Sequence, residues 1–501
     1  MIEGAPLTLF NSLTRQAEHF TPVHQGEARV YSCGPTVYNY PHIGNMRAYV
    51  FADVLGRTLS WKGFKLTHVI NITDVGHLTD DADQGEDKME KMAAEKAQSI
   101  WEVARHYTEA YWADIKALNI RQPADWSIAT NYIEDMLDFA KAIADKHCYE
   151  LPSGLYFDVS TVEDYGKLAR AATDEGEGRI EAVEGKRHAA DFAIWRKTPE
   201  GEKRQMEWDS PWGKGAPGWH LECSVMSGKL LGFPFDIHTG GIDHREIHHP
   251  NEIAQNQAFC GCGGLSEAAN SGARLWMHNN FLVERSGKMS KSSGEFLRLQ
   301  LLIDKGYHPL AYRLLCLQAQ YRSELEFSWE GLSAALTRLK RMVLAVQALK
   351  KRHADKGHDP VEAPEGGWTF AALLDGIGGT LRPLAIRFDE AIAEDLNTPV
   401  ALTVLEELLS LKKMPTDESL ALLGAMDAVL GLNLLQLERT DLRLRPKGST
   451  ISEEMIEAEL RIRKMVRADS DFARADEIRK ELEEEGVSVM DGDPLGWEWK
   501  L

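Results

Sequence analysis

The feature that most constrains the fold is a strand–helix–strand pattern near the start of the chain. Residues Ala28–Ser32 (ARVYS) form a β-prone run that stops at a Cys-Gly-Pro turn. Gly44–Lys62 then carries apolar residues at helical spacing, and Lys65–Ile72 (KLTHVINI) is β-prone again. A unit of this kind implies a parallel sheet. Because ligands of such sheets bind at the carboxyl ends of the strands, we expect an α/β fold with a site near residues 33–45 and 71–74.

The predicted secondary structure changes twice along the rest of the chain. The mixed region from about residue 124 to 210 looks like an insertion between two halves of one fold, and strands are predicted after it at Phe235–His238 and Trp276–Val283. Beyond about residue 300 the pattern predicts helices without convincing strands, up to a small C-terminal unit of one helix and a β-prone tail (GVSVM, then WEWKL). The predicted long helices cover about Lys88–Asn119, Leu332–Lys351, Ala385–Leu396 and Ser452–Glu485.

Composition narrows the class of protein. A chain of 501 residues suggests about three domains at roughly 100–200 residues each. No apolar run reaches the ~20 residues that span a bilayer, and the start lacks a signal-peptide pattern, so we expect neither membrane association nor secretion. Six cysteines in a chain this long fit a reducing, cytoplasmic setting. The net charge of −20 argues against a nucleic-acid partner, because such proteins usually bind through a basic surface.

Two short motifs have the chemistry to bind phosphate groups. Pro41-His42-Ile43-Gly44-Asn45 lies at a strand-to-helix turn, where glycine lets a ligand approach and the helix N-terminus favours anions. Lys288-Met289-Ser290-Lys291-Ser292 is a loop whose two lysines would offset the charge of a triphosphate. Alone, each motif is better explained as a helix-start histidine or a solvated loop. Together and in this order, they resemble the HIGH and KMSKS motifs of class I aminoacyl-tRNA synthetases, which implies ATP-dependent adenylate formation with Mg²⁺.

A further set of side chains has the chemistry to bind a soft or borderline metal ion. Two thiolates, an imidazole and a carboxylate would hold Zn²⁺, and His248 and Glu252 are four residues apart, so they share one face where a helix begins. Spacing alone does not choose among the candidates, because a cysteine is more often a small buried residue than a ligand. The candidates are Cys33, Cys223, His238, His244, His248, His249 and Glu252.

Three segments around these residues resemble the zinc-site segments of the cysteinyl-tRNA synthetase family. They are Tyr31–Tyr38 (YSCGPTVY), Gly218–Cys223 (GWHLEC) and His248–Gln255 (HHPNEIAQ), and the resemblance extends over nearly the whole chain. It implies one Zn²⁺ per subunit, which binds the thiolate of substrate cysteine. The implied zinc ligands are Cys33, Cys223, His248 and Glu252. The implied residues of the cysteine pocket are Gly34, Thr73, Trp219, His238 and Asp243.

The same resemblance implies the activity and the architecture. A cysteine–tRNA ligase would activate L-cysteine with ATP and transfer it to tRNA(Cys), and we expect a monomer. The implied ATP-binding residues are His42, Gly44, Asn45 and Lys291, and the implied catalytic residues are His42, Asn45, Lys288 and Lys291. The implied architecture is a Rossmann-type catalytic domain (1–123 and 216–284) with an inserted connective subdomain (124–215), a KMSKS loop and stem-contact region (285–335), a helical bundle (336–440) and a small α/β anticodon-binding unit (450–501).

Two other functions remain open on the sequence. One is a cysteine ligase that couples cysteinyl-AMP to an amino sugar in thiol biosynthesis, although such relatives lack the anticodon unit. The other is a catalytically inactive paralogue that only binds RNA. The sequence also departs from the commonest family pattern, because it reads HIGN where many members read HIGH and carries Pro250 where many have an acid. His77 has no assigned role, and Cys260 and Cys262 are expected to be reduced thiols without a metal.

Local clusters of basic residues resolve the conflict between the overall charge and a tRNA partner. The segment Thr337–His358 carries seven Lys/Arg against one Asp, and Arg461, Arg463, Lys464 and Arg467 form a second cluster. Contacts to phosphate depend on the nearby surface, so these two clusters are the predicted track for tRNA, although each could equally be a solvated helix face. Trp497 and Trp499 are predicted to stack on unpaired bases if they are exposed.

Overall fold

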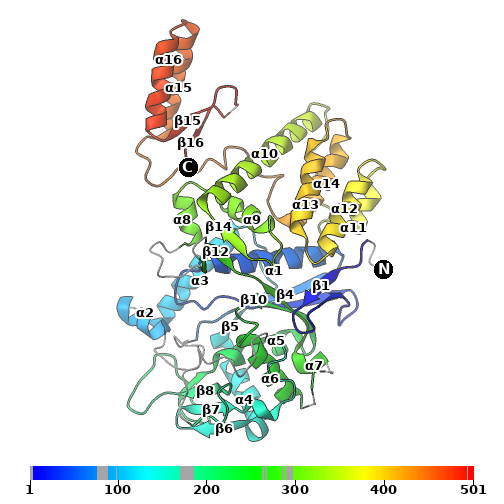
Figure 1. The fold of residues 1–501 in the computed structure, drawn as a ribbon, viewed down its shortest axis with the longest axis vertical. Helices are drawn as coiled ribbons and strands as arrows, with labels where there is room; N and C mark the ends of the chain where they lie inside the picture. Colours follow the sequence, from blue (N-terminus) through cyan, green and yellow to red (C-terminus); the bar gives the residue numbers. More distant parts are fainter. Residues whose placement is uncertain are drawn as a thin grey trace.

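A five-stranded parallel sheet forms the centre of the molecule (Figure 1). Its strand order is β11-β10-β3-β4-β5, and each neighbouring pair is parallel. The strands are β3 (Glu27–Ser32), β4 (Lys65–Ile72), β5 (Asp125–Ile128), β10 (Phe235–Gly241) and β11 (Ala273–Asn279). This arrangement confirms the α/β class. The computed structural model describes residues 4–75, 88–96, 99–169, 185–261, 264–265, 268–284, 287–288, 297–493 and 495–501.

Helix α1 (Ile43–Trp61) connects β3 to β4 and is buried along most of its length. The spacing of residues 44–62 predicts this helix, and its apolar side chains pack between the sheet and the helical half of the molecule. The helix also buries three charged side chains, Arg47, Asp53 and Arg57. Buried charges require partners, so α1 is tied to its surroundings by polar contacts as well as by packing.

The inserted subdomain is an antiparallel sheet with a helix against it. It comprises α4 (Ile133–His147), β6 (Cys148–Leu151), β7 (Gly154–Phe157), β8 (Phe192–Lys197) and β9 (Gly215–Pro217). Two expected boundaries are wrong by a few residues. β5 pairs with β4, so the main sheet continues past residue 123, and β9 pairs with β8, so the inserted sheet continues past residue 215. Short strands take their sheet from a distant partner, which a local pattern does not show.

The predicted strand Trp276–Val283 divides into two strands in different sheets. β11 ends at Asn279, and β12 (Leu282–Glu284) joins β13 (Gly287–Lys288) and β14 (Leu325–Phe327) in a small separate sheet. The expectation of helices alone beyond residue 300 is therefore wrong at β14. Only its pairing with β12, more than 40 residues earlier, gives this three-residue segment its strand conformation.

The helical half lies on the opposite side of α1 from the inserted subdomain (Figure 1). Its elements are α8 (Leu299–Asp304), α9 (Pro309–Leu317), α10 (Trp329–Ala354), α11 (Phe370–Gly376), α12 (Arg382–Ala393), α13 (Thr398–Ser410) and α14 (Thr416–Leu430). Helix α12 ends three residues before the predicted end at Leu396. Asp395 and Leu396 both have positive φ angles, of 49° and 57°, so they cannot continue a right-handed helix.

The long helix predicted from Lys88 to Asn119 is two helices. They are α2 (Lys88–Lys96) and α3 (Ile100–Ala117). The Ser99 hydroxyl accepts a hydrogen bond from Glu102 N, and the Glu102 carboxylate accepts one from Ser99 N. This reciprocal capping starts a new helix, and its Ser-x-x-Glu signature is visible in the sequence.

The C-terminal unit is a helical hairpin followed by a β-hairpin. It comprises α15 (Glu453–Ala468), α16 (Phe472–Glu484), β15 (Val487–Val489) and β16 (Trp497–Trp499). The single helix predicted over Ser452–Glu485 is wrong, because Ser470 has a φ of 67° and Asp471 caps α16. The prediction that Trp497 and Trp499 stack on bases is also wrong. They are 0% and 5% exposed and pack in the core of this unit with the apolar side chains of α15, α16 and β15.

Candidate active site

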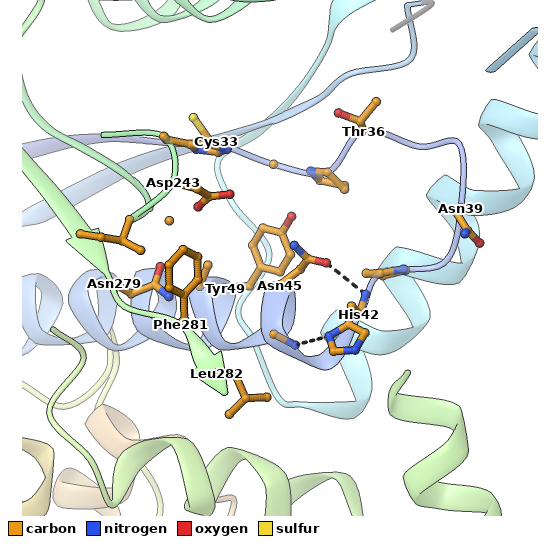
Figure 2. Close-up of a pocket in the computed structure, with 18 of the residues that line it drawn as sticks. Cys33, Thr36, Asn39, His42, Asn45, Tyr49, Asp243, Asn279, Phe281 and Leu282 are labelled. Carbon is orange, nitrogen blue, oxygen red and sulfur yellow. Dashed lines mark hydrogen bonds between the residues drawn. The ribbon is translucent and has the colours of Figure 1, made fainter. Parts of the chain in front are cut away.

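The candidate site is a cleft where the strand order of the main sheet reverses. β3 and β10 are neighbours in the sheet, but the chain proceeds from β3 towards β4 on one side and from β10 towards β11 on the other. The loops that leave the two strands therefore separate and open a crevice. The cleft has a volume of about 370 Å³ and is lined by Cys33, His42, Asn45, Asp243 and Phe281, among others (Figure 2).

The predicted phosphate motif forms the start of α1 at one end of this cleft. His42 caps the helix: its ring Nδ1 accepts a hydrogen bond from Gly44 N at 3.1 Å, and Asn45 Oδ1 accepts one from His42 N at 3.1 Å (Figure 2). Because Nδ1 is an acceptor here, the proton of the neutral imidazole lies on Nε2. No acidic residue lies in the first turn of α1, so no local negative charge offsets the partial positive charge at the N-terminus of this helix.

The four implied zinc ligands come together beside the cleft. Cys33 follows β3, Cys223 lies in α5 (Trp219–Leu231), and His248 and Glu252 lie on one face of α6 (His248–Cys260). One ligand atom from each lies within 4.8 Å of the others, and His248 Nε2 is 2.9 Å from Glu252 Oε1. All four side chains are buried or nearly so. Two thiols, an imidazole and a carboxylate are a donor set that fits zinc.

A second group shares two of these residues and includes His249, a sequence candidate that the family resemblance did not select. Cys33, His238, His249 and Glu252 also offer ligand atoms within 4.8 Å of one another. Cys33 Sγ is 3.3 Å from His249 Nε2, and His238 Nε2 is 2.9 Å from Glu252 Oε2. In addition, His220 Nδ1 is 2.8 Å from His248 Nδ1. The candidate ligands are thus surrounded by imidazoles that can orient them.

Burial and mutual contacts shift the pKa values of the residues in this cluster. Burial raises the pKa of the Cys33 thiol, and the pKa of Cys223 is raised by its contact with Cys33 and by burial. Burial opposes ionisation of Glu252, but His238 and His248 outweigh it and lower the pKa of this carboxyl to about 2. A divalent ion would supply the positive charge that deprotonates the two thiols.

The five residues implied for the cysteine pocket fall into two groups. Gly34 and Asp243 line the cleft beside Cys33. The other three contact the zinc-ligand region. Thr73 donates to Glu222 Oε2 at 2.8 Å, the Trp219 ring lies 4.3 Å from the His248 ring, and His238 contacts Glu252.

Gly34 is a position where no side chain fits. A Cβ added there would lie 1.6 Å from the backbone oxygen of Asn71, and Gly34 N already donates to Asn71 Oδ1 at 2.7 Å. We expect Gly34→Ala to force the ends of β3 and β4 apart at a cost of about 1–3 kcal/mol. Hydrogen exchange of the β3 and β4 amides measures this loss. Gly376→Ala, where a Cβ meets no atom within 4 Å, is the control, and equal protection in the two variants would contradict the expectation.

Several predicted residues fall outside the described residues. Lys291, His77 and Cys262 are among them, and only the backbone of Lys288 is described, in β13. Asp74, at the start of the acidic segment, accepts hydrogen bonds from Thr130 N at 2.9 Å and Thr130 Oγ1 at 2.6 Å.

The two basic clusters are partly neutralised within the molecule. Arg463 is buried and forms a two-bond pair with Asp491, at 2.6 and 2.8 Å, and Arg467 contacts the same carboxylate. Arg461 and Lys464 are exposed. In the first cluster, Arg338, Lys340 and Lys350 pair with Glu406, Glu498 and Glu438, respectively. The surface available to phosphate is therefore smaller than the sequence predicts.

Comparisons with known proteins agree with the fold. The family model described as tRNA synthetases class I (C) catalytic domain matches residues 19–337. The fold is similar to that of Mycobacterium tuberculosis methionyl-tRNA synthetase solved with methionyl-adenylate, with a TM-score of 0.52 and 14% identity over 82% of this chain and 91% of that one. The chain is thus built as a class I aminoacyl-tRNA synthetase.

More similar relatives narrow the family. The chain is 74% identical over 498 residues to a cysteine–tRNA ligase of Novosphingobium aromaticivorans, covering 99% of this chain and 98% of the relative. It is 56% identical to a cysteine–tRNA ligase of Zymomonas mobilis, with coverage of 99% and 98%. The chain belongs to the cysteine–tRNA ligase family of class I synthetases. None of its described helices is both long enough and apolar enough to cross a membrane.

Proposed function

We propose that the chain activates L-cysteine with ATP and then transfers the cysteine to the 3′-terminal ribose of tRNA(Cys). In the first step the cysteine carboxylate attacks the α-phosphorus of ATP, giving cysteinyl-AMP and pyrophosphate. One observation carries the proposal: two thiols, an imidazole and a carboxylate from three distant segments converge at the edge of a cleft that also contains the start of α1.

Cys33, Cys223, His248 and Glu252 would hold one zinc ion per subunit. When bound, zinc would attract a substrate thiolate in preference to a hydroxyl, and so select cysteine over serine. Asp243 is an exposed carboxylate in the cleft close to Cys33 and would pair with the substrate ammonium group (Figure 2). Gly34 lets the ends of β3 and β4 lie close together beside Cys33. Thr73, Trp219 and His238 support the pocket through their contacts with Glu222, His248 and Glu252.

The start of α1 would bind the phosphates of ATP. Gly44 permits close approach, the helix dipole favours the negative charge, and His42 Nε2–H and the Asn45 amide can donate to phosphate oxygens. Asn45 donates as a neutral amide, whereas a histidine at this fourth position of the motif could carry a positive charge. Lys288 and Lys291, with the Mg²⁺ that accompanies ATP, would offset charge on the leaving pyrophosphate.

The transfer step separates this function from the amino-sugar ligase. The C-terminal unit and the helical half supply the length of chain that a tRNA substrate requires, whereas a small acceptor needs neither. We expect the purified protein to charge total tRNA with radiolabelled cysteine and to form no conjugate with glucosamine-type acceptors. Conjugation of the amino sugar without charging of tRNA would exclude the proposed acceptor. We expect a cytoplasmic monomer. A measurement of the molecular mass in solution tests the oligomeric state.

The exposed part of the second basic cluster gives a prediction for tRNA binding. Because Arg463 and Arg467 pair with Asp491, only Arg461 and Lys464 are expected to reach phosphate. The double variant Arg461→Gln/Lys464→Gln should weaken tRNA binding and reduce the slope of log K against log salt by roughly 2. Cysteine-dependent ATP–pyrophosphate exchange should not change. An unaltered salt slope would show that these side chains belong to an ordinary solvated face.

A further inference from the structure

Arg47 is a buried arginine of α1 whose hydrogen bonds are directed to backbone carbonyls. It is 2% exposed. Its guanidinium donates to the oxygens of five residues in two loops: Asn280 at 2.9 Å, Phe281, Gln320 at 3.4 Å, Tyr321 at 3.5 Å and Ser323 at 2.5 Å. Burying a guanidinium is costly unless its donors are satisfied, so this arrangement fixes both loops against α1.

The first of these loops is part of the cleft. Asn280 and Phe281 line it, and Phe281 faces it from the side opposite Cys33 (Figure 2). Directly after Phe281 the chain enters β12, which pairs antiparallel with β13, so that Val283 lies opposite Lys288. A short, hydrogen-bonded path therefore runs from Arg47 through Phe281 and β12 to the backbone of Lys288.

The second loop holds the first in place. Asn280 N donates to Tyr321 O at 2.9 Å, and Leu325 N donates to Phe281 O at 3.0 Å, where β14 begins beside β12. The Phe281 oxygen thus accepts from both Arg47 and Leu325. Removing Arg47 would leave carbonyl oxygens of both loops, including the buried oxygen of Tyr321, without this donor.

We propose that Arg47 is a positioning residue that holds the segment carrying Lys288 in register with α1, whose first turn carries His42 and Asn45. The proposal rests on the proposed function, in which both groups act on one ATP molecule. Arg47 itself does not line the cleft. It acts through the backbone of residues 280–284, and errors of about 1 Å in such positioning can cost 10²-fold in rate.

The planar guanidinium group of arginine is essential to this role. Its five N–H groups lie in one plane and can reach carbonyls in two directions, whereas a lysine ammonium is a single point with three donors. The conservative variant Arg47→Lys keeps the charge but cannot serve both loops. We therefore expect a graded effect, with Arg47→Lys between the wild type and Arg47→Gln.

Steady-state ATP–pyrophosphate exchange tests the proposal, with ATP and cysteine varied separately. We expect kcat/KM for ATP to fall about 10-fold to 100-fold in Arg47→Gln and by an intermediate factor in Arg47→Lys. KM for cysteine should stay within about twofold, because the proposed zinc ligands follow β3 or lie in α5 and α6, outside this path. If Arg47→Gln does not fold, Arg47→Lys alone carries the test.

Arg57→Lys is the matched control. Arg57 is a second buried arginine of α1, and it donates to the carbonyls of Asn119 and Ala428, which lie outside the cleft. Its variant should lower the unfolding temperature and leave kcat/KM for ATP unchanged. Equal changes in the ATP and cysteine parameters, or an ATP effect no larger in Arg47→Lys than in Arg57→Lys, would overturn the proposal. Absence of exchange in the wild type would overturn the proposed function as well.

Discussion

Cys223→Ser is expected to lose both the zinc ion and the preference for cysteine. Cys223 is buried in α5 within 4.8 Å of the other three candidate ligands. A serine hydroxyl stays protonated at neutral pH and is a poor zinc ligand compared with a thiolate. Since loss of an outer-shell partner already costs 10–100-fold in metal affinity, loss of a ligand should cost more than about 100-fold. Metal content after dialysis and cysteine-dependent pyrophosphate exchange measure the two effects.

Cys148→Ser is the matched control for this variant. Cys148 is a half-buried thiol in β6 of the inserted sheet, outside the cluster, and burial raises its pKa to about 12. Its variant should keep stoichiometric zinc and full exchange activity. If Cys223→Ser keeps zinc and still rejects serine, the assigned metal site is wrong.

Asp53→Asn is expected to destabilise α1 strongly. Asp53 Oδ2 lies 2.7 Å from Arg57 Nε and 2.6 Å from Arg313 Nη2, and all three side chains are buried. The arginines also donate to the carbonyls of Ala428 and Leu430, so the network joins α1 and α9 to the end of α14. Removing the only carboxylate of this triad leaves two buried positive charges, which should cost about 3–5 kcal/mol. Native-state hydrogen exchange of the α1 amides measures the loss locally.

The effect of Asp53 should depend on pH in one direction. Burial opposes ionisation, but Arg57 and Arg313 outweigh it and hold the pKa of Asp53 well below its usual range. Because the folded pKa is lower than the unfolded value of about 3.9, the stabilisation is present above that value and is lost as pH falls towards the folded pKa. The difference between wild type and Asp53→Asn should therefore shrink below about pH 4. A difference that grows on acidification would contradict this account.

Asp138→Asn provides the comparison for a surface charge. Asp138 pairs with Lys141 at 3.0 Å, but both side chains are exposed. Its variant should change stability by less than about 1 kcal/mol. A loss in Asp53→Asn no larger than this would mean that the buried network contributes little.

The candidate zinc site shows what the sequence can predict and what it cannot. The spacing of the candidate residues does not select the ligands. Only the resemblance of three separate segments selected Cys33, Cys223, His248 and Glu252. The structure brings these four together, and beside them it places His249, a candidate that the resemblance did not select, and His220, which was not a candidate. Their contacts arise from the packing of β3, α5 and α6 against one another, and the sequence carries no local signal for such packing.

Burial was the main property that the sequence could not supply for the C-terminal unit. Aromatic residues in an implied anticodon-binding unit suggest a base-stacking surface, yet Trp497 and Trp499 are buried in its core. Likewise, a run of arginines suggests a phosphate-binding surface, yet Arg463 faces inward to Asp491, 28 residues later. The βαβ unit and the long helix α10 were predictable because their periodicity reflects a single continuous environment, whereas the two predicted helices over 88–119 and 452–485 are each interrupted.

Cysteine-dependent ATP–pyrophosphate exchange by the wild-type protein tests the central claim most directly. The claim is that the cleft activates cysteine and selects it by its thiol. With L-cysteine and L-serine compared in one zinc-loaded preparation, we expect exchange with cysteine and a kcat/KM for serine at least about 100-fold lower. No exchange with cysteine, or equal exchange with both amino acids, would contradict the account.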